Sequence, residues 1–226
     1  MQLKSIFIDM DGTLTNFNIN YKIAYNNAIK YLTKLGITDP NILNEYRLDD
    51  ILKKLEPIID QKLYNKIKKI FYQFLVDVEH DAAKTPILKI GVKDFLNIMK
   101  LNKIKLIIVT NNNSKSTNLT LKNLNIIEYF DFIITRDNQK IMKPDPSNIL
   151  LAMKKFNVKN NEVIFIGDSW IDIVASNSAN IASIIIYNDK KQIKELNKFK
   201  PTYIVKSYPE ILQILNKIYN LSLQKK

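Results

Sequence analysis

The amino-acid sequence of 226 residues contains no cysteine and a single histidine, His80. The lack of cysteine excludes disulfide bonds, thiol catalysis and thiolate metal ligands, and it agrees with a reducing, cytoplasmic environment. Because one imidazole cannot build a metal site, any bound metal must be held by oxygen ligands. Such ligands favour hard cations, of which Mg²⁺, Mn²⁺ and Ca²⁺ are the candidates.

Long apolar runs are also missing. Runs such as residues 104–109, which Lys105 interrupts, fall far short of the ~20 residues that a membrane helix requires. Asp9 and Asp11 follow the first residue so closely that we expect no signal peptide ahead of them. Hydrophobic residues make up 46% and charged residues 25% of the sequence, which predicts a soluble globular protein with no membrane partner.

The formal net charge of +12 comes mainly from lysine, since arginine occurs only at positions 47 and 136. Lysine-rich usage follows A- and T-rich codons, so genomic bias accounts for part of this excess. Residues 190–226 carry nine Lys and two Glu and could attract nucleic acid. They lack clustered arginine and the interleaved aromatic residues of a base-stacking surface, so we expect no nucleic-acid partner.

Short runs rich in Ile and Val alternate with helical patterns along most of the chain. The runs are nearly continuous in apolar residues, as expected of parallel strands whose two faces are both covered. This alternation predicts a doubly wound α/β domain, in which Asp145 caps a helix that begins at Pro146. The predicted strands are residues 5–8, 105–109, 132–135, 162–166, 183–187 and, more weakly, 203–205; the predicted helices are residues 92–101, 115–124, 146–156, 170–178 and 208–220.

The segment after the first strand departs from this alternation. Apolar side chains recur at helical spacing from Tyr21 to Leu35, ahead of Gly36, and two further amphipathic segments cover residues 42–55 and 62–76. We therefore expect a helical domain inserted after the first strand. The predicted domains are residues 16–85 for the insertion, and residues 1–15 with 86–226 for the α/β core.

Polar side chains follow four of the predicted strands at their carboxyl ends, where parallel α/β sheets bind ligands. Each has a simple alternative: Asp168 can cap the helix from Trp170, Thr110 can complete a turn, and Lys143 can be a solvated charge. A carboxylate directly after a buried strand is harder to explain, because its burial costs several kcal/mol unless cations or donors compensate. Together the residues indicate one site: Asp9, Asp11, Thr110, Asn111, Lys143, Asp168 and Asp172.

These residues form motifs that resemble, in order, the four motifs of the haloacid dehalogenase (HAD) superfamily. The motifs are Asp9-Met10-Asp11-Gly12-Thr13-Leu14, Thr110-Asn111, Lys143-Pro144 and Gly167-Asp168 with Asp172 four residues on. The resemblance covers about residues 1–190 and is nearest to the phosphoglycolate phosphatase and β-phosphoglucomutase branch. It implies a Rossmann-like doubly wound parallel sheet with the first strand central, and a helical C1 cap domain. Asp11, which dehalogenases lack, argues against dehalogenation.

The resemblance implies a Mg²⁺-dependent phosphatase that acts on a small phosphorylated metabolite through an aspartyl-phosphate intermediate. Asp9 would be the nucleophile and Asp11 the general acid and base. Thr110, the Asn111 backbone N–H and Lys143 would hold the phosphoryl oxygens, and Gly12 would let the backbone turn beneath them. The metal would be held by Asp9, the Asp11 backbone carbonyl and Asp168, while Asp172 would orient a metal-bound water or Lys143.

Substrate selection is expected to lie in the helical insertion, with hinges at residues 15–18 and 81–86. Arg47 could grip a substrate carboxylate, or it could form a surface ion pair with Asp49 or Asp50. His80 is expected in a solvated loop. A phosphomutase or a nucleotidase would use the same catalytic residues. A non-catalytic interaction protein on the same fold is a further alternative, and a basic nucleic-acid-binding protein is the weakest one. The sequence leaves open whether the protein is a monomer or a homodimer.

Overall fold

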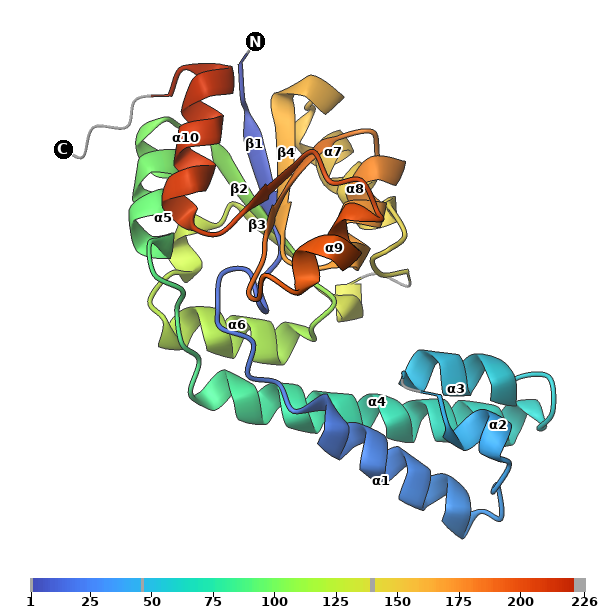
Figure 1. Cartoon of the computed structure of the whole chain (residues 1–226). Helices are drawn as coiled ribbons and strands as arrows, with labels where there is room; N and C mark the ends of the chain where they lie inside the picture. The colour runs from blue at the N-terminus through green and yellow to red at the C-terminus, as the bar shows by residue number, and fades with distance from the viewer. Residues whose placement is uncertain (1, 46, 139–140, 222–226) are drawn as a thin grey trace. The chain divides into compact units, whose positions relative to one another are not determined.

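The computed structural model describes residues 2–45, 47–138 and 141–221. The chain divides into two compact units (Figure 1). One unit comprises Met1–Phe17 and Pro86–Lys226, and we call it the core unit. The other comprises Asn18–Thr85, and we call it the helical unit.

The core unit is built on a six-stranded parallel sheet with the order β3-β2-β1-β4-β5-β6. The central strand β1 pairs on one side with β2, Ile6 opposite Leu106, and on the other with β4, Ile6 opposite Ile164. The predicted Rossmann-like α/β fold, with the first strand central, is confirmed. The strands are β1 (Ser5–Ile8), β2 (Lys105–Val109), β3 (Phe132–Ile134), β4 (Val163–Gly167), β5 (Ala182–Ile186) and β6 (Tyr203–Val205).

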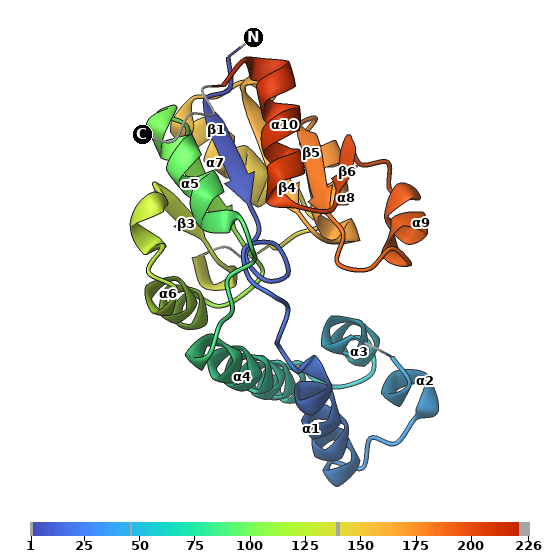
Figure 2. The ribbon, with the colours of Figure 1, turned by 60° about the vertical axis from the view of Figure 1, so that its left-hand side comes forward.

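Helices cover both faces of this sheet, which explains why the strands are apolar throughout. All four residues of β1 are buried, and successive side chains point into different apolar clusters. Ile6 and Ile8 pack with residues of α5, α6 and α10, whereas Phe7 packs with residues of α7 and α8. Figure 2 shows α5 and α10 in front of the sheet and α7 behind it. The helices are α5 (Val92–Leu101), α6 (Ser114–Asn123), α7 (Ser147–Phe156), α8 (Trp170–Ser178), α9 (Gln192–Asn197) and α10 (Tyr208–Tyr219), with short 3₁₀ turns η1 (Ile127–Tyr129), η2 (Arg136–Asn138) and η3 (Asn160–Glu162).

Two details of the core helices differ from the sequence prediction. Helix α7 begins at Ser147 with Pro146 as its N-cap, so Pro146 is not the first helical residue. The Asp145 carboxylate still accepts a hydrogen bond from the Ser147 N–H, at 2.8 Å, one position further from the helix than predicted. Helix α9 was not predicted because it contributes only one buried side chain, Leu196, and so leaves no apolar periodicity in the sequence.

The helical unit contains α1 (Tyr21–Lys34), α2 (Pro40–Leu43), α3 (Leu48–Leu55) and α4 (Gln61–Lys84) around its own apolar core. The predicted helix at residues 42–55 is therefore interrupted between α2 and α3. The predicted helix at residues 62–76 continues to Lys84, since Val78 and Ala83 extend its buried face. Residues 81–84, expected in a hinge, are thus helical, and His80 is an exposed helix residue rather than a loop residue. Among the described helices, none combines the length and apolar character needed to cross a membrane.

The two ends of the insertion are joined within the core unit. The Asn16 N–H donates to the Ile87 carbonyl at 2.8 Å, and the Lys89 N–H donates to the Leu14 carbonyl at 2.9 Å. Between them, Thr15 and Leu88 form an antiparallel bridge. The chain therefore leaves and re-enters the core unit through one short stretch of paired backbone.

Candidate active site

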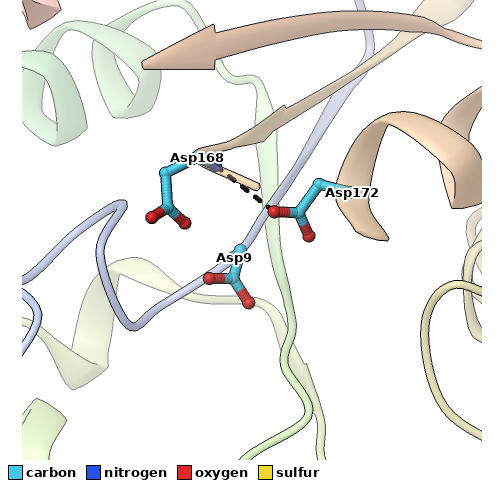
Figure 3. A group of neighbouring side chains, drawn as sticks. All are labelled: Asp9, Asp168 and Asp172. Carbon is cyan, nitrogen blue, oxygen red and sulfur yellow. Dashed lines mark hydrogen bonds between the residues drawn. The ribbon is translucent and has the colours of Figure 1, made fainter. Parts of the chain in front are cut away.

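The carboxyl ends of β1 and β4 lie side by side and bring three carboxylates together. Asp9 directly follows β1, Asp168 directly follows β4, and Asp172 lies in the first turn of α8. Figure 3 shows the three side chains converging, and one oxygen of each lies within 4.8 Å of the others. All the ligand atoms are oxygens, so this donor set fits a hard divalent cation such as Mg²⁺.

Lys143 lies against two of these carboxylates. Its Nζ is 2.6 Å from Asp9 Oδ1 and 2.7 Å from Asp172 Oδ1, and its side chain is 1% exposed. The backbone of Lys143 is fixed by the Asn111 side chain, which donates to the Lys143 carbonyl at 2.8 Å and accepts from its N–H at 3.1 Å. Lys143 is therefore a buried and fixed residue of the site. The alternative that it is a solvated surface charge is wrong.

Asp172 is fixed through its second oxygen. Oδ2 accepts hydrogen bonds from the Ser169 N–H at 3.1 Å, from the Ser169 hydroxyl at 2.6 Å and from the Asp168 N–H at 3.3 Å. Gly167 allows this close approach, because a Cβ at that position would lie 2.6 Å from the Asp172 side chain. Asp172 thus orients Lys143 through one oxygen while the other oxygen holds the loop that carries Asp168.

Burial and mutual repulsion shift the proton affinities of this group. Burial, reinforced by the charge of Asp172, raises the pKa of Asp9 to about 6, although Lys143 opposes the rise. Burial, with the charges of Asp9 and Asp172, raises the pKa of Asp168 to about 8. Burial alone would lower the pKa of Lys143, but Asp172 and Asp9 outweigh it and raise that pKa. When all three carboxylates are ionised, the two ammonium groups that act on them, Lys143 and Lys89, do not balance their charge.

The remaining predicted residues lie on the loops around this centre. Thr110 is buried, and its hydroxyl accepts from the Asn112 N–H at 3.1 Å. Asp11 is outside the acidic group, and its Oδ2 accepts from Asn112 Nδ2 at 2.8 Å. The Asn111 side chain is engaged with Lys143, which leaves its backbone N–H as the group predicted to hold phosphate. Gly12 has φ +86° and lies directly against the Asp168 carboxylate.

Two residues of this neighbourhood were missed in the sequence. Asn112 contacts both Thr110 and Asp11, and the polar run of Asn111, Asn112 and Asn113 after a buried strand was its only signal. Arg136 donates from Nη1 to the Asn111 carbonyl at 3.0 Å. No regular spacing in the sequence marks either contact.

Arg47 belongs to the helical unit and precedes α3. Its guanidinium lies 3.4 Å from Asp49, and both side chains are about half exposed. Asp50 instead faces Lys53 at 3.2 Å. The surface ion pair with Asp49, one of the two alternatives for Arg47, is thus present in the structure.

A doubly wound parallel sheet that gathers carboxylates and a buried lysine beyond its strand ends is the arrangement of an α/β enzyme, and its three carboxylates could hold a cation. The chain belongs to the haloacid dehalogenase-like hydrolase family, whose family model matches residues 6–186. The family and the hydrolase class predicted from the four motifs are both confirmed.

Relatives of this chain match it over nearly its whole length. A pyrophosphatase PpaX of Halalkalibacterium halodurans is 26% identical over 217 residues, which cover 95% of this chain and 98% of that protein. A phosphoglycolate phosphatase of Nitrosococcus oceani is 25% identical over 222 residues, which cover 95% and 97%. The crystal structure of a hydrolase from Pseudomonas syringae has the same fold, with a TM-score of 0.70 at 23% identity over 95% of this chain and 99% of that one.

Replacing Lys143 with Met should lower the free energy of unfolding by about 3–5 kcal/mol at pH 8 without divalent cations, since it leaves buried carboxylates without their counter-charge. The pKa of Asp9 in the folded state then rises further above its unfolded value. The destabilisation should therefore shrink as the pH falls to 5, where Asp9 takes up a proton. Urea unfolding at both pH values measures this. Adding Asp172→Asn should restore part of the stability at pH 8, and an equal loss at both pH values would contradict the ion-pair account.

Gly12→Ala should disturb the cation site in a way that Gly36→Ala does not. Both glycines have positive φ, +86° and +78°, so each substitution strains the backbone by about 1–2 kcal/mol. Only a Cβ at Gly12 meets the Asp168 carboxylate, whereas no atom lies within 4 Å of a Cβ at Gly36. Titration calorimetry with Mg²⁺ should show weaker binding for Gly12→Ala and unchanged binding for Gly36→Ala. Equal affinities in the two variants would mean that Asp168 does not hold the cation.

Proposed function

We propose that the protein is a Mg²⁺-dependent phosphatase that hydrolyses a small phosphorylated metabolite through an aspartyl-phosphate intermediate on Asp9. The observation that carries this proposal is the buried Asp9 carboxylate, held at 2.6 Å by Lys143 within a group of three carboxylates. Such a centre can bind a divalent cation through its carboxylates and a phosphate group through that cation and Lys143. The similarity to a phosphoglycolate phosphatase supports the same reaction class.

The cation would be held by Asp9, Asp168 and the backbone carbonyl of Asp11. When bound, Mg²⁺ offsets the negative charge of the phosphate and of the carboxylates around it. This role is needed because an anionic nucleophile and a phosphate dianion repel each other. The Asp9 and Asp168 carboxylates, with oxygens that lie within 4.8 Å of each other, are suited to share such an ion, while Asp172 holds Lys143.

Asp9 would attack the phosphorus atom, which converts one difficult displacement into two easier ones. Lys143 holds Asp9 Oδ1 and adds a positive charge beside the transferred phosphoryl group. The Thr110 hydroxyl accepts from Asn112, so its own proton can be donated to a phosphoryl oxygen. The Asn111 N–H would supply a second donor, and the absence of a side chain at Gly12 leaves the Asp168 carboxylate in place.

Asp11 would move the protons. In the first step its carboxyl group gives a proton to the leaving alcohol oxygen as the P–O bond breaks. In the second step its carboxylate takes a proton from the water that attacks the phosphoryl group, and Asp9 is regenerated. Asp11 lies two residues from Asp9 on the same loop, which allows one residue to act on each side of the phosphoryl group.

The helical unit would act as the cap that selects the substrate. It is inserted in the sequence after the loop that carries Asp9 and Asp11, and the segments that lead into and out of it are paired within the core unit. Arg47, the only arginine of this unit, would pair with a substrate carboxylate in exchange for Asp49. Small anionic or polyhydroxylated phosphate esters are therefore the expected substrates.

Hydrolysis of 4-nitrophenyl phosphate should occur with Mg²⁺ or Mn²⁺ and should stop in excess chelator. Ca²⁺ should inhibit, because its looser coordination misplaces the nucleophile and the phosphorus. A screen of phosphorylated metabolites with Mg²⁺ then ranks the substrates. Full activity in chelator would contradict the role of the metal. Exchange between isomers of a sugar phosphate, with a bisphosphate intermediate, would instead indicate a phosphomutase, and a preference for nucleoside monophosphates would indicate a nucleotidase.

Asp9→Asn should abolish turnover of every ester, whereas the effect of Asp11→Asn should depend on the leaving group. General acid catalysis is worth roughly 10²–10⁴-fold in rate, and 4-nitrophenolate leaves without needing a proton. In single-turnover experiments, Asp11→Asn should therefore slow phosphorylation by an alkyl phosphate far more than by 4-nitrophenyl phosphate. Equal losses with the two esters would show that Asp11 is not the acid.

A further inference from the structure

Asn112 is a buried residue whose side chain faces Asp11. It is 3% exposed, and its Nδ2 donates to Asp11 Oδ2 at 2.8 Å across 101 positions of sequence. Its backbone is held on both sides, because its N–H donates to the Thr110 hydroxyl at 3.1 Å and its carbonyl accepts from the Arg136 N–H at 3.0 Å. The loop thus presents Asn112 to Asp11 in a defined position.

The direction of the Asn112 amide is fixed by a main-chain donor. Its Oδ1 accepts from the Asn113 N–H at 2.7 Å. A backbone N–H can only donate, so the oxygen of the amide must face Asn113 and the NH₂ group must face Asp11. The contact with Asp11 Oδ2 is therefore a hydrogen bond from an amide N–H to a carboxylate oxygen, and not the reverse.

We propose that Asn112 is a positioning residue that selects which oxygen of Asp11 transfers the proton; this inference rests on the proposed phosphatase function. In a neutral carboxyl group the carbonyl oxygen is the stronger acceptor, so the N–H of Asn112 favours Oδ2 as the carbonyl oxygen and Oδ1 as the oxygen that carries the transferable proton. In the first step the Oδ1–H bond breaks, and the proton goes to the leaving oxygen, which takes the electron pair of the P–O bond. In the second step Oδ1 receives a proton from the attacking water.

Asn112 also couples this proton to the phosphoryl donor. Its N–H occupies a lone pair of Thr110 Oγ1, and its side chain holds Asp11, so one residue sets the position of both groups. The proton-carrying oxygen and the phosphoryl group must be aligned within a fraction of an ångström for efficient transfer. Asn112 provides this alignment through its backbone N–H on one side and its side-chain amide on the other.

Asn113 offers a matched control, since it performs the structural task of the loop. Its Oδ1 accepts from the Ser116 N–H at 2.9 Å and caps α6, and its Nδ2 donates to the Ser116 hydroxyl at 2.9 Å. Its Nδ2 also lies 3.3 Å from Asn112 Oδ1, but the shorter bond to that oxygen comes from the Asn113 main-chain N–H, which an alanine keeps. Asn112 and Asn113 are adjacent, buried and of the same residue type. A loss that follows only from loosening the loop should appear in both Asn112→Ala and Asn113→Ala.

The test compares kcat/KM for glycerol phosphate and for 4-nitrophenyl phosphate, both with Mg²⁺, in the wild type and these variants. We expect Asn112→Ala to lower kcat/KM for glycerol phosphate by about tenfold or more, and for 4-nitrophenyl phosphate by less than about threefold, because only the alkoxide needs the proton. Asn113→Ala should leave the ratio of the two values unchanged. In the Asp11→Asn background, Asn112→Ala should cause no further selective loss.

Asn112→Asp keeps the size of the side chain and the oxygen that faces Asn113. This variant is used in place of Asn112→Ala if the alanine variant does not fold. It replaces the donor with an acceptor and should give the same selective loss on glycerol phosphate. Equal losses on the two esters, a shifted ratio in Asn113→Ala, or a full additional selective loss in the Asp11→Asn background would overturn the role of Asn112. A wild-type protein that hydrolyses neither ester would instead overturn the proposed function itself.

Discussion

The Lys143 ammonium lies between two buried carboxylates, and the arrangement of the site depends on it. Asp9 comes from the end of β1, Asp172 from the start of α8, and Lys143 from the chain between β3 and α7. Each buried ion carries a desolvation cost of several kcal/mol, which only close pairing can offset. The ends of two neighbouring strands and a distant loop are therefore held at the distances that these ion pairs require.

The two ion pairs of Lys143 do not balance every carboxylate of the site, because a third carboxylate, Asp168, lies beside them. Burial beside Asp9 and Asp172 raises the pKa of Asp168 to about 8, although the Thr13 hydroxyl and the charge of Lys89 oppose the rise. At neutral pH the protein without metal therefore favours a proton on this carboxyl group. The divalent cation proposed for this site would be held by the same carboxylates and would supply the positive charge that they lack.

The sheet and the acidic centre could be predicted because both follow from local patterns. Continuous apolar runs such as residues 5–8 mark strands covered on both faces, and Asp9 is placed at the sheet edge by its position after such a run. The end of α4 and the whole of α9 were not predictable, since few of their residues face an apolar core. The contact of Asn112 with Asp11 joins positions 101 residues apart, and nothing in the spacing of either segment encodes it.

The paired backbone at the two ends of the insertion has a consequence for how the chain can vary. Leu14 to Asn16 and Ile87 to Lys89 are hydrogen-bonded to each other inside the core unit, so the helical unit begins and ends at nearly the same point. The 68 residues of Asn18–Thr85 are therefore an insertion whose two ends lie together, and its length does not change the geometry of the sheet. Modules of other sizes and sequences can be exchanged at this junction during evolution or engineering, while the catalytic scaffold keeps its geometry.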